Sequence, residues 1–198
     1  MTLLQLQQQI EKVLREGGIE QAQSEARFLL QDALGLDRAQ LLMRYREPAR
    51  EADIESAFAW AKRRADGEPL QYILGHTDFM GLDIRVAPGV LIPRPETEGL
   101  CELFLQETKR RTAQKSKQTC RILDLCTGSG CIASWAGHAF PKAAVSATDL
   151  SEDALAIARK NCAAHEAFPG QIEVLQGDLF EALPKDVQPF DVILSNPP

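Results

Sequence analysis

The strongest constraint on the fold is the regular alternation of apolar strands and helical patterns after residue 120. The run RILDLC (121–126) is followed by the glycine-rich turn TGSG and by a helical segment that Pro141 ends. Three further apolar runs follow, AAVSATDL, IEVLQGD and FDVILSN, and the amphipathic segment SEDALAIARKNCAAH separates the first two. Strands that alternate with helices favour a parallel sheet. The sequence therefore predicts an α/β fold with a Rossmann-like, doubly wound sheet.

The first seventy residues have a helical pattern instead. Apolar residues recur at helical spacing from Leu3 to Leu14, and glycines stop this pattern at residue 17. A second helix would end at Gly35, Asp37 would cap a short third helix, and a fourth would span residues 51–65. Short helices joined by tight turns predict a small bundle at residues 1–68. We interpret it as a substrate-recognition module, because no cluster of catalytic residue types lies in it.

Residues 69–95 are predicted to connect the bundle to the third domain, residues 96–198. The apolar runs Tyr72–Leu74 and Leu82–Val86 flank two glycines, which favours a β-hairpin. The prolines of VLIPRPETE (90–98) exclude a helix before residue 95, whereas Pro95 suits the first turn of a helix. That helix is predicted to run to about Thr108.

Charge and cysteine content narrow the possible partners. The net charge is −6, with 28 acidic and 22 basic residues, so direct nucleic-acid binding is not favoured. The basic segment 109–121 contains no aromatic residue, and we interpret it as a solvated linker. The five cysteines form no C-x-x-C pair, so neither a disulfide framework nor a metal site is predicted. Without a signal peptide or membrane span, the expected compartment is the cytoplasm.

The segment DLCTGSG (124–130) is the strongest chemical signal. In a parallel α/β sheet, ligands bind beyond the carboxyl ends of the strands. Gly128 and Gly130 would let a ligand approach the backbone, or would serve the geometry of the turn alone. Ala133 replaces the third glycine of the dinucleotide fingerprint, so a pyrophosphate is not indicated. Asp124 before the turn favours a cationic or amine-bearing ligand.

The other three strands also end in polar residues. Asp149 closes the second strand, where a carboxylate can accept hydrogen bonds from ribose hydroxyls. After the third strand, Leu179 would border an adenine and Asp178 would accept from its amine, although an aspartate here also suits an ordinary turn. The fourth strand leads into Ser195–Pro198, a stiff loop rich in hydrogen-bond acceptors that suits an incoming NH₂ group.

In this order, DLCTGSG, ATDL, QGDLF and SNPP resemble the class I S-adenosylmethionine methyltransferases that methylate amino groups with an N-P-P-aromatic motif. The segment VLIPRPETE, placed between a helical domain and the glycine-rich turn, is similar to the HemK/PrmC family. The members of this family are protein-(glutamine) methyltransferases of peptide chain release factors. The resemblance covers nearly the whole chain.

This resemblance implies S-adenosyl-L-methionine as the cofactor and a release factor as the protein partner. Asn196, Pro197 and Pro198 would hold the glutamine amide of the Gly-Gly-Gln motif, and Arg94 and Glu98 would belong to a P-R-x-x-T-E element near the site. The implied cofactor-binding residues are Asp124, Cys126, Thr127, Gly128, Ser129, Gly130, Asp149, Asp178, Leu179 and Asn196.

Two departures from the family pattern affect the expected activity. Cys126 stands where the family usually has glycine, and the chain stops at Pro198, before the expected aromatic residue and the later strands. We therefore expect an incomplete sheet and an inactive part of a longer enzyme. The alternatives are a DNA adenine or RNA guanine amino-methyltransferase acting on a flipped base, or an inactive docking fragment.

Overall fold

The computed structural model describes residues 1–112 and 120–197, and the chain forms two compact units. We call Met1–Leu74 the helical unit and Gly75–Pro198 the sheet unit. No helix among the described residues is long and apolar enough to cross a membrane.

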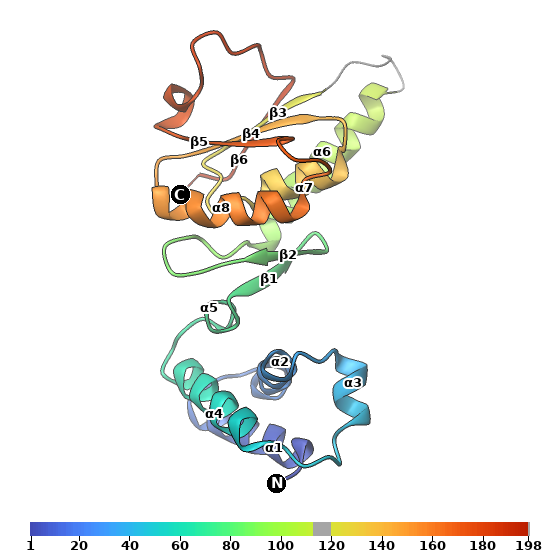
Figure 1. Ribbon diagram of the computed structural model, residues 1–198, viewed down its shortest axis with the longest axis vertical. Helices are drawn as coiled ribbons and strands as arrows, with labels where there is room; N and C mark the ends of the chain where they lie inside the picture. Colours follow the sequence, from blue (N-terminus) through green and yellow to red (C-terminus); the bar gives the residue numbers. More distant parts are fainter. Residues whose placement is uncertain (113–119, 198) are drawn as a thin grey trace. The chain divides into compact units, whose positions relative to one another are not determined.

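The helical unit confirms the predicted bundle and adds one short helix (Figure 1). Leu6, Ile10 and Leu14 of the first helix are fully buried against Leu29 and Leu30 of the second, so their apolar faces form the core. The helices are α1 (Leu3–Glu16), α2 (Ala22–Leu34), α3 (Arg38–Met43), α4 (Glu51–Ala65) and α5 (Leu70–Leu74).

Local capping explains where these helices begin and end. The Thr2 side chain accepts a hydrogen bond from Gln5 N–H, and the Gln5 side-chain oxygen accepts one from Thr2 N–H. Asp37 caps α3 in the same way through Gln40, as predicted. Gly35 ends α2 in the left-handed conformation, with φ at 61°.

The prediction that Tyr72–Leu74 forms a strand is wrong. These residues lie in α5, where the N–H groups of Tyr72 and Ile73 donate to the carbonyl of Pro69. A run of three apolar residues carries too little periodicity to separate strand from helix. Ile73 is instead buried against the core of the bundle.

A β-hairpin opens the sheet unit. Strand β1 (His76–Phe79) pairs antiparallel with β2 (Leu82–Arg85). The turn residues Met80 and Gly81 both have positive φ, at 53° and 80°, which matches the twist of a tight hairpin. The predicted second strand is therefore confirmed as β2, whereas the first strand lies at His76–Phe79 instead of Tyr72–Leu74.

The sheet unit then confirms the predicted α/β alternation. Four parallel strands lie in the order β5-β4-β3-β6, with α7 and α8 on one face (Figure 1). The chain moves outward from β3 through β4 to β5 and returns to the other side of β3, which creates a switch point there. The elements are α6 (Pro95–Thr112), β3 (Arg121–Leu125), α7 (Cys131–Ala139), β4 (Ala144–Asp149), α8 (Glu152–His165), β5 (Ile172–Gln176), the 3₁₀ turn η1 (Leu179–Ala182) and β6 (Val192–Ser195).

Helix α6 extends beyond its predicted end at Thr108 to Thr112, into the basic segment, whose residues 113–119 lie outside the described chain. It packs on α7 through aromatic contacts. The ring of Phe104 lies 6.1 Å from that of Trp135 and 4.9 Å from that of Phe140, between ring centroids. These contacts hold the middle of α6 against α7.

Asn161 joins three parts of the sheet unit. From its buried position on α8, its Oδ1 accepts from Arg85 N–H (2.9 Å), and its Nδ2 donates to the carbonyls of Arg85 (2.9 Å) and Ser129 (2.8 Å). One side chain thus connects the hairpin to the turn that follows β3.

We expect Asn161→Ala to lower the free energy of unfolding by about 2–3 kcal/mol, because three backbone groups lose their partner. Lys160→Ala is the matched control. It removes an exposed side chain from the same helix and should change stability by less than about 0.5 kcal/mol. Denaturant unfolding followed by circular dichroism measures both, and equal effects would contradict the assigned role.

Candidate active site

The parallel sheet brings the four polar strand ends to one edge. The glycine turn, defined as Cys126–Gly130, follows β3, and Asp149 ends β4 beside it. Asp178 follows β5 and Asn196 follows β6. Backbone hydrogen bonds join neighbouring strand ends, from Thr127 N–H to the carbonyl of Thr148 (2.9 Å) and from Gly177 N–H to the carbonyl of Asp149 (3.0 Å).

The glycine turn needs three residues with positive φ. Gly128 and Gly130 have φ of 55° and 78°, and Cys126 has 61°. A Cβ atom at Gly130 would also approach the Cα and Cβ of Ala158 on α8 to 3.0 Å. Glycine is therefore required at residue 130 by packing as well as by conformation. Cys126 adopts a conformation that favours glycine, which is the residue that the resemblance implies at this position.

Asp124 lies fully buried beneath the glycine turn. Its Oδ2 accepts hydrogen bonds from the Thr127 hydroxyl and from Ala133 N–H (3.1 Å). Its Oδ1 is buried with no hydrogen-bond partner among the described residues. Burial raises the pKa of Asp124 to about 7, although the bond from Thr127 opposes the shift. In this conformation the carboxyl group supports the turn through its hydrogen bond from Thr127. Direct contact with a ligand would require the turn to open.

Asp149 is half-buried and fixes the turn from the other side. Its Oδ2 accepts from Gly128 N–H (2.8 Å) and its Oδ1 accepts from Ser151 N–H (3.0 Å). The Ser151 hydroxyl caps α8 by accepting from Ala154 N–H, as predicted. Each carboxylate oxygen has a second lone pair, so ribose binding by Asp149 stays a prediction.

The segment after β5 exposes the residues predicted to contact an adenine. Asp178 is exposed, and Leu179 is 48% exposed with φ at 48°. The neighbouring Phe180 is 55% exposed. Leu179 and Phe180 thus expose apolar side chains at the same edge as Asp149, and contact of Asp178 and Leu179 with adenine stays a prediction.

Asn196 is held by a residue that the motif analysis missed. Its Nδ2 donates to the Thr97 hydroxyl over 2.9 Å. Ser195 is fixed as well, because its hydroxyl donates to the carbonyl of Leu125 (2.7 Å). Thr97 lies inside PRPETE, so that motif was its only sequence signal. Asn161 on α8 gave no signal at all.

The structure also locates the P-R-x-x-T-E residues. The Arg94 carbonyl accepts from Thr97 N–H (2.9 Å) as α6 begins. Glu98 Oε1 accepts from Met80 N–H in the hairpin turn (2.8 Å). The element therefore joins the hairpin to the loop after β6. Pro197 is exposed beside Asn196, and Pro198 lies outside the described residues.

Pockets in both units lie away from this edge. An apolar pocket of about 320 Å³ lies between α6 and the start of β6, at the opposite end of that strand from Asn196. It is lined by Leu100, Leu103, Phe104, Glu107, Thr108, Asp191, Val192 and Leu194.

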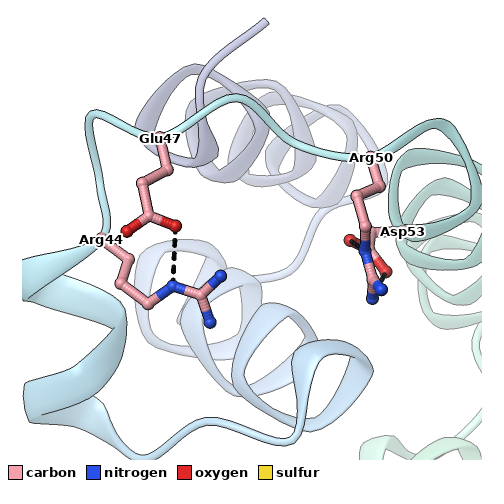
Figure 2. Close-up of polar contacts among 4 residues, drawn as sticks. All are labelled: Arg44, Glu47, Arg50 and Asp53. Atoms are coloured by element: carbon pink, nitrogen blue, oxygen red, sulfur yellow. Dashed lines mark hydrogen bonds and ion pairs between the residues drawn. The ribbon is translucent and has the colours of Figure 1, made fainter.

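A second pocket, of about 290 Å³, lies in the helical unit and is bordered by Arg44 and Arg50. Figure 2 shows that each arginine faces an acid, with Arg44 Nε 2.8 Å from Glu47 and Arg50 2.7 Å from both oxygens of Asp53. Because both guanidinium groups are paired, this pocket does not attract an anion strongly. Among the described residues, no group of His, Cys, Asp or Glu could hold a metal ion.

The pKa of Asp124 generates a prediction about pH. Its folded-state pKa of about 7 is above the ordinary value of 3.8, so the folded chain retains a proton that the unfolded chain loses between these values. The Asp124 contribution to stability therefore falls as pH rises from about 4 to about 7 and is constant above that. Asp124→Asn keeps an acceptor without the ionisation. We expect its melting temperature, relative to wild type, to rise between pH 4 and 8, and a constant difference would contradict the shifted pKa.

The left-handed backbone of Cys126 makes stability depend on the side chain at this position. Cys126→Gly removes the left-handed strain but adds backbone freedom to the unfolded chain, so stability should stay within about 1 kcal/mol of wild type. Cys126→Val places a β-branched residue at positive φ and should lose about 1–3 kcal/mol. Denaturant unfolding compares the two variants. Equal stability of the valine and glycine variants would show that the turn has no such conformational demand.

Comparisons with known proteins match both parts of the chain. A family model described as the PrmC N-terminal domain matches residues 5–75, and one described as the methyltransferase small domain matches residues 101–198. Of the solved structures, the N-terminal domain of human METTL16 in complex with SAH has a TM-score of 0.50 and 20% identity, covering 86% of this chain and 64% of that chain. At this identity the likeness shows a shared fold alone.

Three curated relatives are named release factor glutamine methyltransferase. The protein of Geobacter sulfurreducens is 40% identical over 93% of this chain and 61% of its own length. The protein of Koribacter versatilis is 44% identical over 87% of this chain and 58% of its own length. The chain thus spans about three fifths of the length of these two relatives. The protein of Moorella thermoacetica is 38% identical over 100% of this chain and 67% of its own length. By this similarity and by the order of the two matched domains, the chain belongs to the release factor glutamine methyltransferase family.

Proposed function

We propose that the protein transfers the methyl group of S-adenosyl-L-methionine to the side-chain amide nitrogen of the glutamine in the Gly-Gly-Gln motif of a peptide chain release factor. The observation that carries this proposal is the position of Asn196, a fixed carboxamide at the same sheet edge as the glycine turn. Membership of the family supports the choice of substrate.

The residues at this edge fit the cofactor. S-adenosylmethionine carries a sulfonium and an ammonium group, and the carboxylates of Asp149 and Asp178 give this edge a negative charge that favours a cationic cofactor. The glycine turn would lie against the methionine part, Asp149 would hold the ribose, and Leu179 would border the adenine. When bound, the cofactor supplies an activated methyl group.

The chain's own contribution would be to place the target amide. An amide nitrogen is a weak nucleophile because its lone pair is delocalised into the carbonyl group. We define the acceptor corner as Asn196 Oδ1 and the carbonyl oxygen of Pro197. These two acceptors would orient the NH₂ group toward the methyl group and stabilise the positive charge that develops on nitrogen. As the bond between nitrogen and the methyl carbon forms, the bond between that carbon and sulfur would break and leave a neutral thioether. The surplus proton on nitrogen would leave afterwards, so no strong base is needed before transfer.

A protein substrate is favoured over a nucleic acid. The chain has a net charge of −6, and the helical unit matches the PrmC N-terminal model, which accompanies a methyltransferase domain in the family. We therefore propose that the helical unit docks the release factor. Because release factors act at ribosomes, the proposed compartment is the cytoplasm.

Asn196→Ala tests this proposal in a protein that extends the chain to the full length of its relatives. Methylation of the release factor should fall by at least about 100-fold, because one acceptor for the target amide is lost. The dissociation constant for S-adenosylmethionine, measured by calorimetry, should stay within a few-fold.

Two further measurements complete this test. The wild-type protein is incubated with a radiolabelled methyl donor and either release factor, duplex DNA or structured RNA, and only the release factor should be labelled. Unchanged turnover of Asn196→Ala, or preferential labelling of nucleic acid, would contradict the proposal.

A further inference from the structure

We propose that Thr97 is a positioning residue that turns the Asn196 carboxamide so that its oxygen faces the substrate, which makes the acceptor corner selective for an amide over a carboxylate. This inference rests on the proposed function and assigns a specificity role within the same site.

The first support is the hydrogen bond between these two side chains. Asn196 Nδ2 donates to Thr97 Oγ1 over 2.9 Å. Thr97 is only 4% exposed, whereas Asn196 is exposed. A buried hydroxyl group therefore engages the donor end of an exposed amide. With one of the two Nδ2–H groups engaged in this way, the carboxamide is held with its Oδ1 turned away from Thr97, where it can accept a hydrogen bond from a ligand.

The second support is that Thr97 itself is firmly placed. Its N–H donates to the Arg94 carbonyl, and the next two side chains along the same helix face, Cys101 and Phe104, are buried. The neighbouring Glu98 ties the start of α6 to the hairpin turn through Met80 N–H. Thr97 thus acts from a rigid element and can impose an orientation on a loop residue.

The third support comes from the other side of the loop. Ser195 pairs with Leu125 in the parallel register of β3 and β6, and its hydroxyl donates to the Leu125 carbonyl. Asn196 is therefore fixed through its backbone by β6 and through its side chain by Thr97. The position is set by the strand, and the direction of the amide is set by Thr97.

The chemistry that follows is discrimination between glutamine and glutamate. A carboxamide brings two N–H donors to the acceptor corner, whereas a carboxylate brings only acceptors and a negative charge. The carboxylates of Asp149 and Asp178 at the same edge add to the repulsion. A polar site that accepts hydrogen bonds from its ligand strongly rejects a ligand without those donors. This discrimination is stronger than that of an apolar pocket between ligands of different size.

Three variants test this inference in a protein extended to the length of its relatives. Thr97→Val keeps the shape of the side chain and removes the hydroxyl, while Thr97→Ser keeps the hydroxyl. Thr108→Val is the matched control, because the Thr108 hydroxyl donates to the carbonyls of Phe104 and Leu105 within the same helix. Each variant is assayed for kcat and KM with the release factor, for cofactor affinity, and for inhibition by the same factor carrying glutamate in place of the glutamine.

We expect Thr97→Val to lower kcat by about 10–100-fold with cofactor affinity unchanged within about two-fold. Thr97→Ser should stay within about three-fold of wild type, and Thr108→Val should match wild type. The glutamate factor should bind wild type at least about ten-fold more weakly than the glutamine factor, and Thr97→Val should narrow that gap.

The outcomes separate this inference from the proposed function. If wild type does not methylate the release factor, the proposed function fails and the inference fails with it. If wild type is active but Thr97→Val retains its kcat and its preference for glutamine, only the inference is overturned. Equal losses in the valine and serine variants would also overturn it, because they would reflect packing rather than the hydroxyl group.

Discussion

The hydrogen bonds that hold the glycine turn are the constraint on which the rest of the sheet unit depends. Asp124 supports the turn from below through Thr127, Asp149 holds Gly128 N–H from the next strand, and Asn161 binds the carbonyl of Ser129 from α8. Three residues of the turn have positive φ, a conformation that is unfavourable for most side chains. These contacts from β3, β4 and α8 keep the turn in one shape, so the backbone is already arranged for a ligand before one binds.

The same contacts connect the turn to the parts that would handle the substrate. Asn161 also binds both backbone groups of Arg85, so the hairpin is joined to the cofactor side of the site. In the hairpin turn, Met80 N–H donates to Glu98 on α6. Thr97, the residue before Glu98, accepts a hydrogen bond from Asn196. Hydrogen bonds and the backbone between them thus connect the glycine turn through the hairpin and α6 to the acceptor corner. In the proposed reaction, these connections would align the methyl donor and the target amide on one rigid frame.

Most of the secondary structure was predictable because local patterns and tertiary packing agree. The capping residue Asp37, the start of α6 at Pro95 and the strands that precede each polar end lie where the sequence placed them. The prediction failed at Tyr72–Leu74, where three apolar residues are compatible with either state and burial of Ile73 in the helical core decides the outcome. It also missed the end of α6, because Thr108 is followed by good helix formers rather than by a stop signal.

The sequence by itself determined the α/β class, the four polar strand ends and the family, because strand periodicity and short motifs are local properties of the chain. Only the tertiary structure decided which side chains support them. Thr97 and Asn196 are 99 residues apart, and Asn161 lies 76 residues from Arg85, so no local pattern could pair them. The structure also showed that Asp124 is buried beneath the turn. The motif places a carboxylate before the turn but does not reveal that packing removes it from solvent. Packing of α6, α8 and the hairpin within the sheet unit creates these contacts, and that packing exists only once the unit has folded.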